Sequence, residues 1–200
     1  MRTPFDADAA GYDEDTFHPY VAEQLIAGLD RDPKLLVDVA AGTGAAAFAA
    51  LRLLAPAAVL AIDLSPAMIE IAQAKATAQD PDGRITWQVG SAVPLPVADG
   101  EADAVVCASA LHFLGQRALA DWHRVLRPGG KLAFSMVSAE RFTPSGKFAE
   151  LVPRDLRVPG TLEEAAALAT DAGFRTATAQ HVKRDQGDRV RQVFAVFAEA

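Results

Sequence analysis

From residue 34 onward the chain alternates short apolar runs with segments of helical periodicity, and no other feature constrains its fold as strongly. This alternation is typical of parallel strands joined by crossover helices. Near-continuous hydrophobicity in several of the runs indicates a sheet that is covered on both faces. Strands are expected at residues 34–40, 57–64, 84–90, 102–109 and 131–138. The chain is therefore predicted to be an α/β protein.

The segments between these runs carry the signals of helices. Residues 44–55 are rich in alanine and leucine. A second helix is predicted over 66–78, because Ser65 is a good N-cap and Pro66 suits the first helical position. A third is predicted over 116–126, where the sequence "RPGG" ends it. Its apolar stripe consists of Leu119, Trp122, Val125 and Leu126.

The C-terminal part is predicted to add one helix and an antiparallel edge. Thr161 and Glu164 form a capping box for a helix that runs to about Asp171. The runs 176–183 and 192–200 follow, separated by the polar sequence "RDQGDR". Two such runs indicate a terminal β-hairpin, which would give the parallel sheet an antiparallel edge.

An amphipathic helix is predicted near the N-terminus, where Val21, Leu25 and Leu29 recur at four-residue spacing after Pro19. Such a helix can pack on the sheet, or it can form a lid over the ends of the strands. The sequence leaves both interpretations open.

Charge and cysteine content narrow the class of partner. A formal charge of −7 argues against nucleic acids and anionic membranes, which such a chain would repel. The one cysteine, Cys107, lies in an apolar strand, where a buried and inert thiol is expected. It permits no internal disulfide and no cysteine-rich zinc site, which suits a reducing cytoplasm. We find no secretory h-region and no run of about 18 apolar residues, so a cytoplasmic location is expected.

The turn after the first expected strand, "GTGAAA", is the usual place for a ligand in an open α/β sheet. It satisfies the loose dinucleotide pattern G-x-G-x-x-G/A, which is weak evidence when taken alone. A P-loop is excluded, because no Lys-Ser or Lys-Thr follows the glycines to hold terminal phosphates.

Two acids decide between ligands. Asp38 lies four residues before Gly42, where its charge would repel a pyrophosphate by a few kcal/mol at an effective dielectric of about 20. A ligand with a cation at that position would be attracted instead. Asp63 ends the second strand, 19 residues after Gly44, and can accept hydrogen bonds from both hydroxyls of a ribose. An adenosine joined to an ammonium-bearing chain satisfies both acids, and S-adenosylmethionine is that molecule.

The order of the motifs matches a known family. "VDVAAGTG", "AIDLSPAMIEIA", "VGSAVPLPVADGEADAVVCASALHFL" and "HRVLRPGGKLAFS" follow one another at normal spacing, after an arm "PFDADAAGYD". Together they resemble the class I S-adenosylmethionine-dependent methyltransferases, specifically the small type similar to the quinone-biosynthesis C-methyltransferases. The resemblance covers roughly residues 4–138. It implies a Rossmann-like sheet of seven strands in the order 3-2-1-4-5-7-6, mostly parallel, with helices on both faces.

The resemblance also implies roles for individual residues. Asp38 would lie under the methionine end of the cofactor, and Asp63 would bind the ribose. The backbone would approach the ligand at Ala40, Gly42 and Gly44, where the glycines have no Cβ in the way. The adenine would be flanked by Leu64 and Met68, and the sulfonium approached by the backbone near Ala108 and Ser109. After methyl transfer the cofactor leaves as S-adenosylhomocysteine.

Two positions depart from the family's commonest pattern. Ala40 stands in place of a glycine, which adds one methyl group. Ser91 and Ala92 stand where "Asp-Ala" is usual, at the position that accepts a hydrogen bond from the adenine amino group. A serine hydroxyl can accept that bond without charge assistance, so somewhat weaker cofactor binding is expected.

Methyl transfer from a sulfonium mostly requires alignment, and a base is needed only where the acceptor must lose a proton. The candidate base is His112, three residues past the fourth strand, although the same residue could simply shape the substrate site. Tyr12 could cap the cofactor or touch the acceptor, or serve a structural role. A surface position is expected for His123. Neither His18 nor His181 has partners at metal-ligand spacing, so no metal site is expected.

Residues 139–160 form a connection of 22 residues after the fifth strand. Its Phe142 and Phe148 could form an apolar wall for an acceptor or anchor the loop. Its basic residues could attract an acidic acceptor or pair with acids of the N-terminal arm. The basic residues are Arg141, Lys147, Arg154 and Arg157, and the acids are Asp6, Asp8, Asp13, Glu14 and Asp15.

A length of 200 residues suits one domain. We expect an N-terminal arm and helix, with a lid as one interpretation, over 1–33, a cofactor-binding core over 34–138, and an acceptor-side loop, helix and hairpin over 139–200. The leading hypothesis is methyl transfer to oxygen, nitrogen or carbon of a small-molecule metabolite, by a monomer or homodimer. Alternatives are a cofactor-binding relative that catalyses cyclisation or acts as a partner protein, and a nicotinamide oxidoreductase, which Asp38 disfavours.

Overall fold

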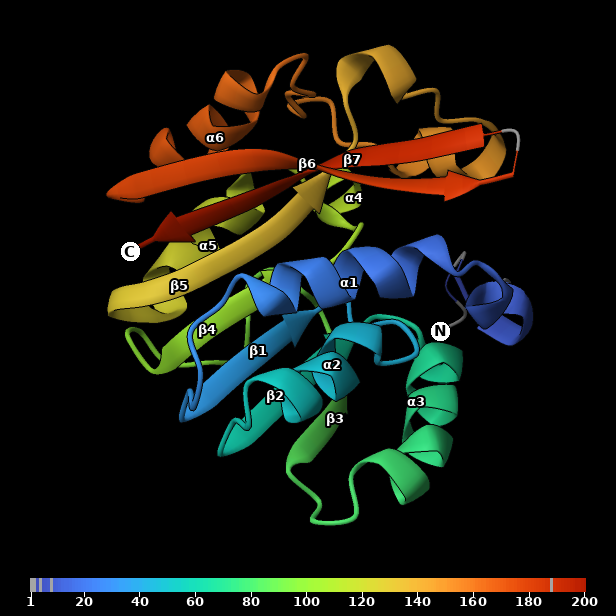
Figure 1. The fold of residues 1–200 in the computed structure, drawn as a ribbon, viewed down its shortest axis with the longest axis vertical. Helices are drawn as coiled ribbons and strands as arrows, with labels where there is room; N and C mark the ends of the chain where they lie inside the picture. Colours follow the sequence, from blue (N-terminus) through green and yellow to red (C-terminus); the bar gives the residue numbers. More distant parts are fainter. Residues whose placement is uncertain (1–2, 4, 8, 188) are drawn as a thin grey trace.

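A computed structural model of the chain, which describes residues 3, 5–7, 9–187 and 189–200, contains one twisted sheet of seven strands (Figure 1). Their order is β3-β2-β1-β4-β5-β7-β6, as the family resemblance implied. The strands are β1 (Leu35–Val39), β2 (Ala58–Asp63), β3 (Ile85–Val89), β4 (Ala102–Cys107), β5 (Leu126–Met136), β6 (Thr176–Gln186) and β7 (Arg189–Glu199).

Strand β1 lies at the centre of the parallel part, between β2 and β4, and Asp38 pairs with Ala61 on one side and Val106 on the other. The antiparallel edge forms because β7 pairs with both β5 and β6. The order in which strands are added to the sheet reverses between β1 and β4. Because β1, β2 and β4 are parallel, their carboxyl ends lie together at one end of the sheet. In open α/β folds this end is where ligands bind.

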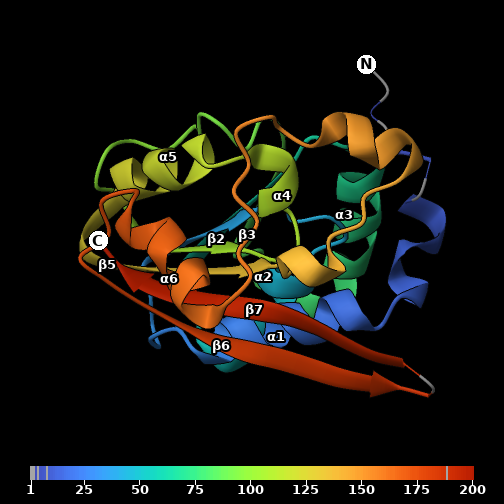
Figure 2. The same ribbon diagram turned by 90° about the horizontal axis from the view of Figure 1, so that it is seen from above.

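Helices cover both faces of the sheet, giving three layers (Figures 1 and 2). One face carries the first three α-helices and the other face the last three. The helices are α1 (Phe17–Ala27), α2 (Ala45–Leu53), α3 (Pro66–Gln79), α4 (Leu111–Leu114), α5 (Arg117–Val125) and α6 (Leu162–Thr170), with short 3₁₀ segments η1 (Ala9–Glu14), η2 (Ala139–Arg141) and η3 (Gly146–Leu151).

The core is correspondingly divided by the sheet. Leu119, Trp122 and Val125 of α5 are fully buried and pack with strand residues of one face, as their spacing predicted. Val21 and Leu25 of α1 pack with α2 on the opposite face. The two apolar layers hold the strands from both sides, which fixes the positions of the strand ends.

The predicted helix starts are confirmed. Ser65 accepts a hydrogen bond at its side chain from the Met68 amide, and Pro66 begins α3. Thr161 and Glu164 form both halves of a capping box at the start of α6. These local signals act within a few residues of sequence, and sequence reasoning therefore located them well.

Strand β5 begins earlier than predicted. The sequence "RPGG" ends the helix, as expected, but it lies inside the strand rather than before it. The reason is tertiary: Gly129 donates to the carbonyl of Ala200, and Ala200 donates to the carbonyl of Gly130. Ala200 therefore extends the strand pairing into "RPGG", a sequence that is typical of a turn.

The terminal hairpin is longer than predicted. Its strands run through the polar sequence that was expected to separate them, with register pairs continuing to Gln186 and Arg189. Polar residues fit there because antiparallel strands tolerate a solvated face. The predicted gap between 183 and 192 is therefore wrong.

Helix α1 packs on α2 and on the sheet, which confirms the first of the two interpretations for the predicted helix. The segment before it, η1, lies beside α3 at the strand ends. In the described part of the chain, no helix has both the length and the apolar character needed to span a membrane.

Candidate functional site

The loop between β1 and α2 bends sharply enough to place three residues in the left-handed region, with φ of 54° at Ala40, 55° at Gly42 and 90° at Gly44. For Ala40 this conformation costs roughly 1–2 kcal/mol, and a glycine would avoid that cost. The alanine therefore brings backbone strain as well as an extra methyl group. Strained residues of this kind cluster at functional sites.

The two glycines of this loop meet different neighbours. A Cβ at Gly42 would lie 3.5 Å from the ring of Tyr12, in ordinary contact with the N-terminal arm. A Cβ at Gly44 would lie 2.5 Å from the Trp87 side chain and 2.8 Å from Phe48, which is too close. The absence of a Cβ at Gly44 thus makes room for the Trp87 and Phe48 side chains under the loop. From the sequence, this absence was expected to make room for the ligand.

Asp63 ties two loops together. Its Oδ2 accepts a hydrogen bond from the Gly42 amide at 2.7 Å, and its Oδ1 accepts one from the Ser65 amide at 2.8 Å. Burial raises the pKa of this carboxyl, and the two amide hydrogen bonds oppose the rise. A carboxylate has about four acceptor positions, so further acceptor capacity is left for two ligand hydroxyls.

Asp38 lies deeper than Asp63. It is buried beneath the loop, and its Oδ2 accepts a hydrogen bond from the Ala47 amide at 2.9 Å in the first turn of α2. Burial raises the pKa of this carboxyl to about 8, and the neighbouring Asp63 adds to the rise. Without a ligand this carboxyl is therefore mostly protonated at neutral pH, and a ligand cation above it would favour its charged form.

The residues that were expected to lie beside an adenine differ in their exposure to solvent. Leu64 is 55% exposed and the end of β3 at Val89 is 50% exposed, so both offer apolar surface beside Asp63. Met68 is buried in α3 and is less accessible than the sequence suggested. Ala92 is half-buried.

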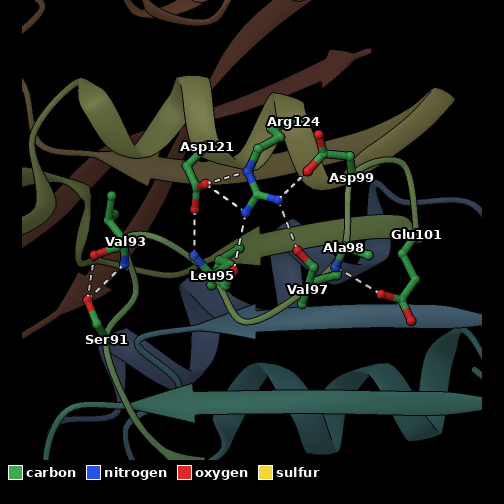
Figure 3. Close-up of polar contacts among 9 residues, drawn as sticks. All are labelled: Ser91, Val93, Leu95, Val97, Ala98, Asp99, Glu101, Asp121 and Arg124. Atoms are coloured by element: carbon green, nitrogen blue, oxygen red, sulfur yellow. Dashed lines mark hydrogen bonds and ion pairs between the residues drawn. The ribbon is translucent and has the colours of Figure 1, made fainter.

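Ser91 begins the loop between β3 and β4, and its hydroxyl is already engaged. It donates to the Val93 carbonyl at 2.6 Å and accepts from the Val93 amide at 3.1 Å (Figure 3). One lone pair is left to accept a bond from an adenine amino group. Ser91 therefore differs from the usual aspartate in two ways. It carries no charge, and its hydroxyl is already hydrogen-bonded within the local turn.

Arg124 of α5 holds the rest of this loop (Figure 3). Its guanidinium donates to the carbonyls of Leu95 and Val97 and pairs with Asp99 and Asp121. The Asp121 carboxylate in turn accepts a hydrogen bond from the Leu95 amide at 2.6 Å. A single side chain thus fixes the loop that presents Ser91 and Ala92.

The N-terminal arm is joined to these loops by polar contacts. The Ser65 hydroxyl donates to Asp6, and the Thr43 hydroxyl donates to Asp13 at 2.6 Å. Lys75 of α3 pairs with Asp13 at 2.5 Å. The arm therefore crosses the carboxyl ends of β1 and β2.

Tyr12 lies in this arm between the loop and the first turn of α1. Its ring stacks on His18, with ring centroids 5.6 Å apart. Burial, together with the carboxylates of Asp63 and Asp15, raises the pKa of Tyr12 to about 12. The hydroxyl consequently stays protonated at neutral pH and can donate a hydrogen bond.

A cavity of about 760 Å³ opens on the other side of Tyr12, beyond the ends of β4 and β5. Its polar lining includes Ser109, His112 and Ser135, and its aromatic lining includes Phe113 and Phe142. We call it the acceptor cavity. Its remaining lining residues are Phe17, His18, Val137, Arg141, Thr143, Pro144, Ser145, Phe148, Val190, Arg191, Gln192 and Val193.

Ser109 and the preceding Ala108 follow β4 directly and join the acceptor cavity to the loop after β1. Ser109 has a φ of 64°, and its amide donates to the Ser135 hydroxyl at 2.8 Å. Its own hydroxyl oxygen is buried and has no hydrogen-bond partner among the described residues. A strained residue with an unpaired buried polar atom is typical of a ligand site.

His112 lies in α4 against the rings of Phe113 and Phe142. Burial lowers the pKa of His112 to about 4, and the nearby His18 lowers it further. Within the described part of the chain its Nδ1 has no hydrogen-bond partner. The imidazole is therefore neutral at physiological pH and can accept a proton or a hydrogen bond.

Sequence reasoning missed His18, which it tested only for metal-ligand spacing. The imidazole lines the acceptor cavity and lies 3.4 Å from the Asp15 carboxylate. Burial lowers its pKa, and Asp15 opposes that change. The only available signal was its place six residues after Tyr12 in the arm.

The remaining histidines and the cysteine lie outside the cavity. His123 is half-buried and packs edge-on against Phe174, so it is less exposed than predicted. His181 contacts Gln192 and Phe194 in the hairpin. Cys107 is fully buried, and burial raises its thiol pKa, as an inert thiol requires. Among the described residues no cluster of metal-ligating side chains is present.

Among the described side chains of the 139–160 connection, the arginines do not pair with acids of the arm. Arg157 pairs with Asp171, and Arg141 donates to the Val190 carbonyl at 3.2 Å. Arg154 is exposed and lies outside the lining of the acceptor cavity. The arm's Asp15 pairs instead with Arg191 of β7 at 2.6 Å. Asp8 and the side chain of Lys147 lie outside the described part of the structure.

This strand order, with acids at the ends of β1 and β2 and a cavity beyond β4, defines a Rossmann-like methyltransferase fold. Residues 37–134 match a family model described as "Methyltransferase domain". The chain is 38% identical over 104 residues to a ubiquinone/menaquinone biosynthesis C-methyltransferase from Dinoroseobacter shibae, covering 51% of this chain and 42% of that protein. It is 34% identical over 137 residues to a malonyl-[acyl-carrier protein] O-methyltransferase from Methylococcus capsulatus, covering 66% and 49%.

Solved structures agree in fold. A methyltransferase in complex with its activator from Haloferax volcanii superposes with a TM-score of 0.81 at 21% identity, over 99% of this chain and 98% of that one. An S-adenosylmethionine-dependent methyltransferase from Thermotoga maritima gives 0.68 at 20% identity, over 98% and 97%. The chain is similar to the class I S-adenosylmethionine-dependent methyltransferases and shares their fold. Its matches span about half the length of the curated relatives.

The packing role of Gly44 predicts that alanine substitution costs more stability at Gly44 than at Gly83, which also has a positive φ. Gly44→Ala should lower the free energy of unfolding by about 2–4 kcal/mol, from left-handed strain plus overpacking against Trp87. Gly83→Ala is the control, since it has a φ of 66° and open space around its Cβ; about 1–2 kcal/mol is expected there. Urea denaturation measures both, and equal losses would contradict the packing role.

Burial of Asp38 predicts an unusual pH dependence for the ligand-free protein. Because its folded pKa of about 8 lies above the ordinary value of 3.8, the free energy of unfolding should fall between those pH values as pH rises. Asp38→Asn keeps an acceptor for the Ala47 amide but cannot ionise. The variant should therefore be more stable than wild type at pH 8, and the difference should shrink toward pH 5. Parallel pH profiles in urea denaturation would show that Asp38 does not titrate in this range.

Proposed function

We propose that this chain transfers a methyl group from S-adenosylmethionine to a small-molecule acceptor bound in the acceptor cavity. The observation that carries the proposal is the junction at the ends of two neighbouring strands. Asp38 lies near the end of β1, and Ser109 lies just past the end of β4 and lines the cavity. A cofactor on the β1 loop would thus face the cavity directly.

The residues present fit this cofactor. Asp63 has acceptor capacity for the ribose hydroxyls, and exposed Leu64 offers an apolar face for the adenine. The Asp38 charge would favour the ammonium of the methionine end and would disfavour a pyrophosphate. These are the features that separate S-adenosylmethionine from a dinucleotide at the same turn.

We also propose that the N-terminal arm acts as a lid over the cofactor. Tyr12, Asp13 and Asp6 already contact the loops that would hold it. The protonated hydroxyl of Tyr12 can donate a hydrogen bond to a bound ligand. Closure of the arm would also exclude water from the reacting groups.

When bound, S-adenosylmethionine supplies a methyl group on a sulfonium, which is already activated toward displacement. The protein's main task is to hold the acceptor in line with it. For a hydroxyl acceptor, the neutral imidazole of His112 would take the hydroxyl proton. Ser109 and Ser135 can hold polar groups of the acceptor at the end of β4.

The proposed setting follows from charge and cysteine content. A net charge of −7 makes nucleic acid an unsuitable partner, and one buried cysteine without a disulfide suits the cytoplasm. We propose a cytoplasmic enzyme of small-molecule metabolism that works as a monomer or homodimer.

Calorimetry with S-adenosylmethionine and NAD tests the cofactor. We expect binding of S-adenosylmethionine alone. Asp38→Asn should weaken it by about 1 kcal/mol or more, because the charge that favours the ammonium is lost. Asp80→Asn is the matched control. Asp80 is also buried and accepts two backbone amide hydrogen bonds, but it lies at the amino end of β3, away from the site. Tight NAD binding without a response to S-adenosylmethionine would overturn the proposal. An unchanged affinity of Asp38→Asn for S-adenosylmethionine would show that Asp38 does not help to select this cofactor.

The role of His112 is tested with a hydroxyl acceptor. His112→Gln keeps hydrogen-bonding capacity but cannot take the proton, so turnover should fall about 10²-fold or more while cofactor affinity persists. In the wild type, turnover should fall only as pH is lowered toward the His112 pKa of about 4. His123→Gln, outside the cavity on α5, should retain normal turnover. Normal turnover of His112→Gln would exclude the histidine as base.

A further inference from the structure

The acceptor cavity differs in charge from the rest of the chain. The chain has 26 acidic and 19 basic residues. Yet the described lining of the cavity includes two arginines, Arg141 and Arg191, and no carboxylate. A cavity with this charge attracts anions and repels ammonium groups.

The two arginines are held differently. Arg191 lies over the ring of Phe17 at 4.3 Å and makes two 2.6 Å contacts with Asp15, which is behind the cavity wall. Its charge is therefore largely neutralised. Arg141 is exposed at the cavity, and its Nη1 donates to the neutral Val190 carbonyl. Among the described residues no carboxylate pairs with Arg141, so its charge is available to a ligand.

Aromatic rings form the adjoining wall. Phe113 lies 4.1 Å from His112 and 5.8 Å from Phe148, measured between ring centroids. Phe142 lies 5.8 Å from His112 on another side. Rings arranged in this way accommodate a flat aromatic body beside the imidazole.

We infer that the acceptor is an aromatic hydroxy acid, whose ring packs against Phe113 and Phe142, whose carboxylate pairs with Arg141 and whose hydroxyl faces His112. The inference rests on the proposed methyl transfer and names its substrate class. It also favours an acidic acceptor as the partner of Arg141, because Arg141 lines the cavity while Asp13 and Asp15 of the arm pair with Lys75 and Arg191. Amines of similar shape are disfavoured, because the charge of Arg141 would repel their ammonium group.

Binding of three matched probes tests the inference. These are 3-(4-hydroxyphenyl)propanoate, its primary amide and tyramine, which share a phenol ring and differ in the charge at the other end. Titrated by calorimetry into the protein with S-adenosylhomocysteine present, the acid should bind at least about tenfold more tightly than the amide, and tyramine most weakly. Arg141→Gln should remove the preference for the acid without changing amide binding. Arg154→Gln, on the same connection but outside the cavity, should keep it.

Several results would overturn the inference. Equal binding of acid and amide would do so, as would tighter binding of tyramine, no binding of any probe, or an undiminished acid preference in Arg141→Gln. Thermal melting of both variants checks that the exposed substitutions leave the fold intact. The proposed function fails by a separate result, which is the absence of S-adenosylmethionine binding. An enzyme that binds the cofactor but rejects the acid would refute the substrate class alone.

Discussion

The carboxylate of Asp63 joins the two loops on which the candidate site depends. By accepting the amides of Gly42 and Ser65, it fixes the turn after β1 against the start of α3. Asp38 does the same one layer deeper, where it accepts the Ala47 amide at the start of α2. Burial makes each charged form costly, and the amide hydrogen bonds offset part of that cost. The geometry that a cofactor would meet is therefore set by buried acids and backbone amides.

Charge is divided between the two halves of the site. The carboxyl ends of β1 and β2 carry the acids Asp38 and Asp63. The acceptor cavity carries arginines and neutral imidazoles among aromatic rings. Between the halves lies Tyr12, whose ring is 3.5 Å from the position of a Cβ added at Gly42 and stacks on His18.

Much of the fold followed from local patterns. Apolar runs located the parallel strands to within a few residues, and the caps at Ser65 and Thr161 located helix starts, because these signals act over a single turn or strand. The extension of β5 through "RPGG" did not follow, since it depends on hydrogen bonds from Ala200, about seventy residues away in sequence. The hairpin was underestimated because cross-strand pairing overrides the polarity of single residues.

The candidate site, like the fold, could be predicted from the sequence only in part. The sequence by itself determined the acids at the ends of β1 and β2 and the glycine turn between them, because strand alternation places such residues at one edge. Only the tertiary structure decided that Gly44 makes room for Trp87, that His18 lines the acceptor cavity and that Arg141 faces it while Arg154 does not. These outcomes depend on which distant side chains share a space. Periodicity and spacing carry no information on that, because packing is settled by the whole fold.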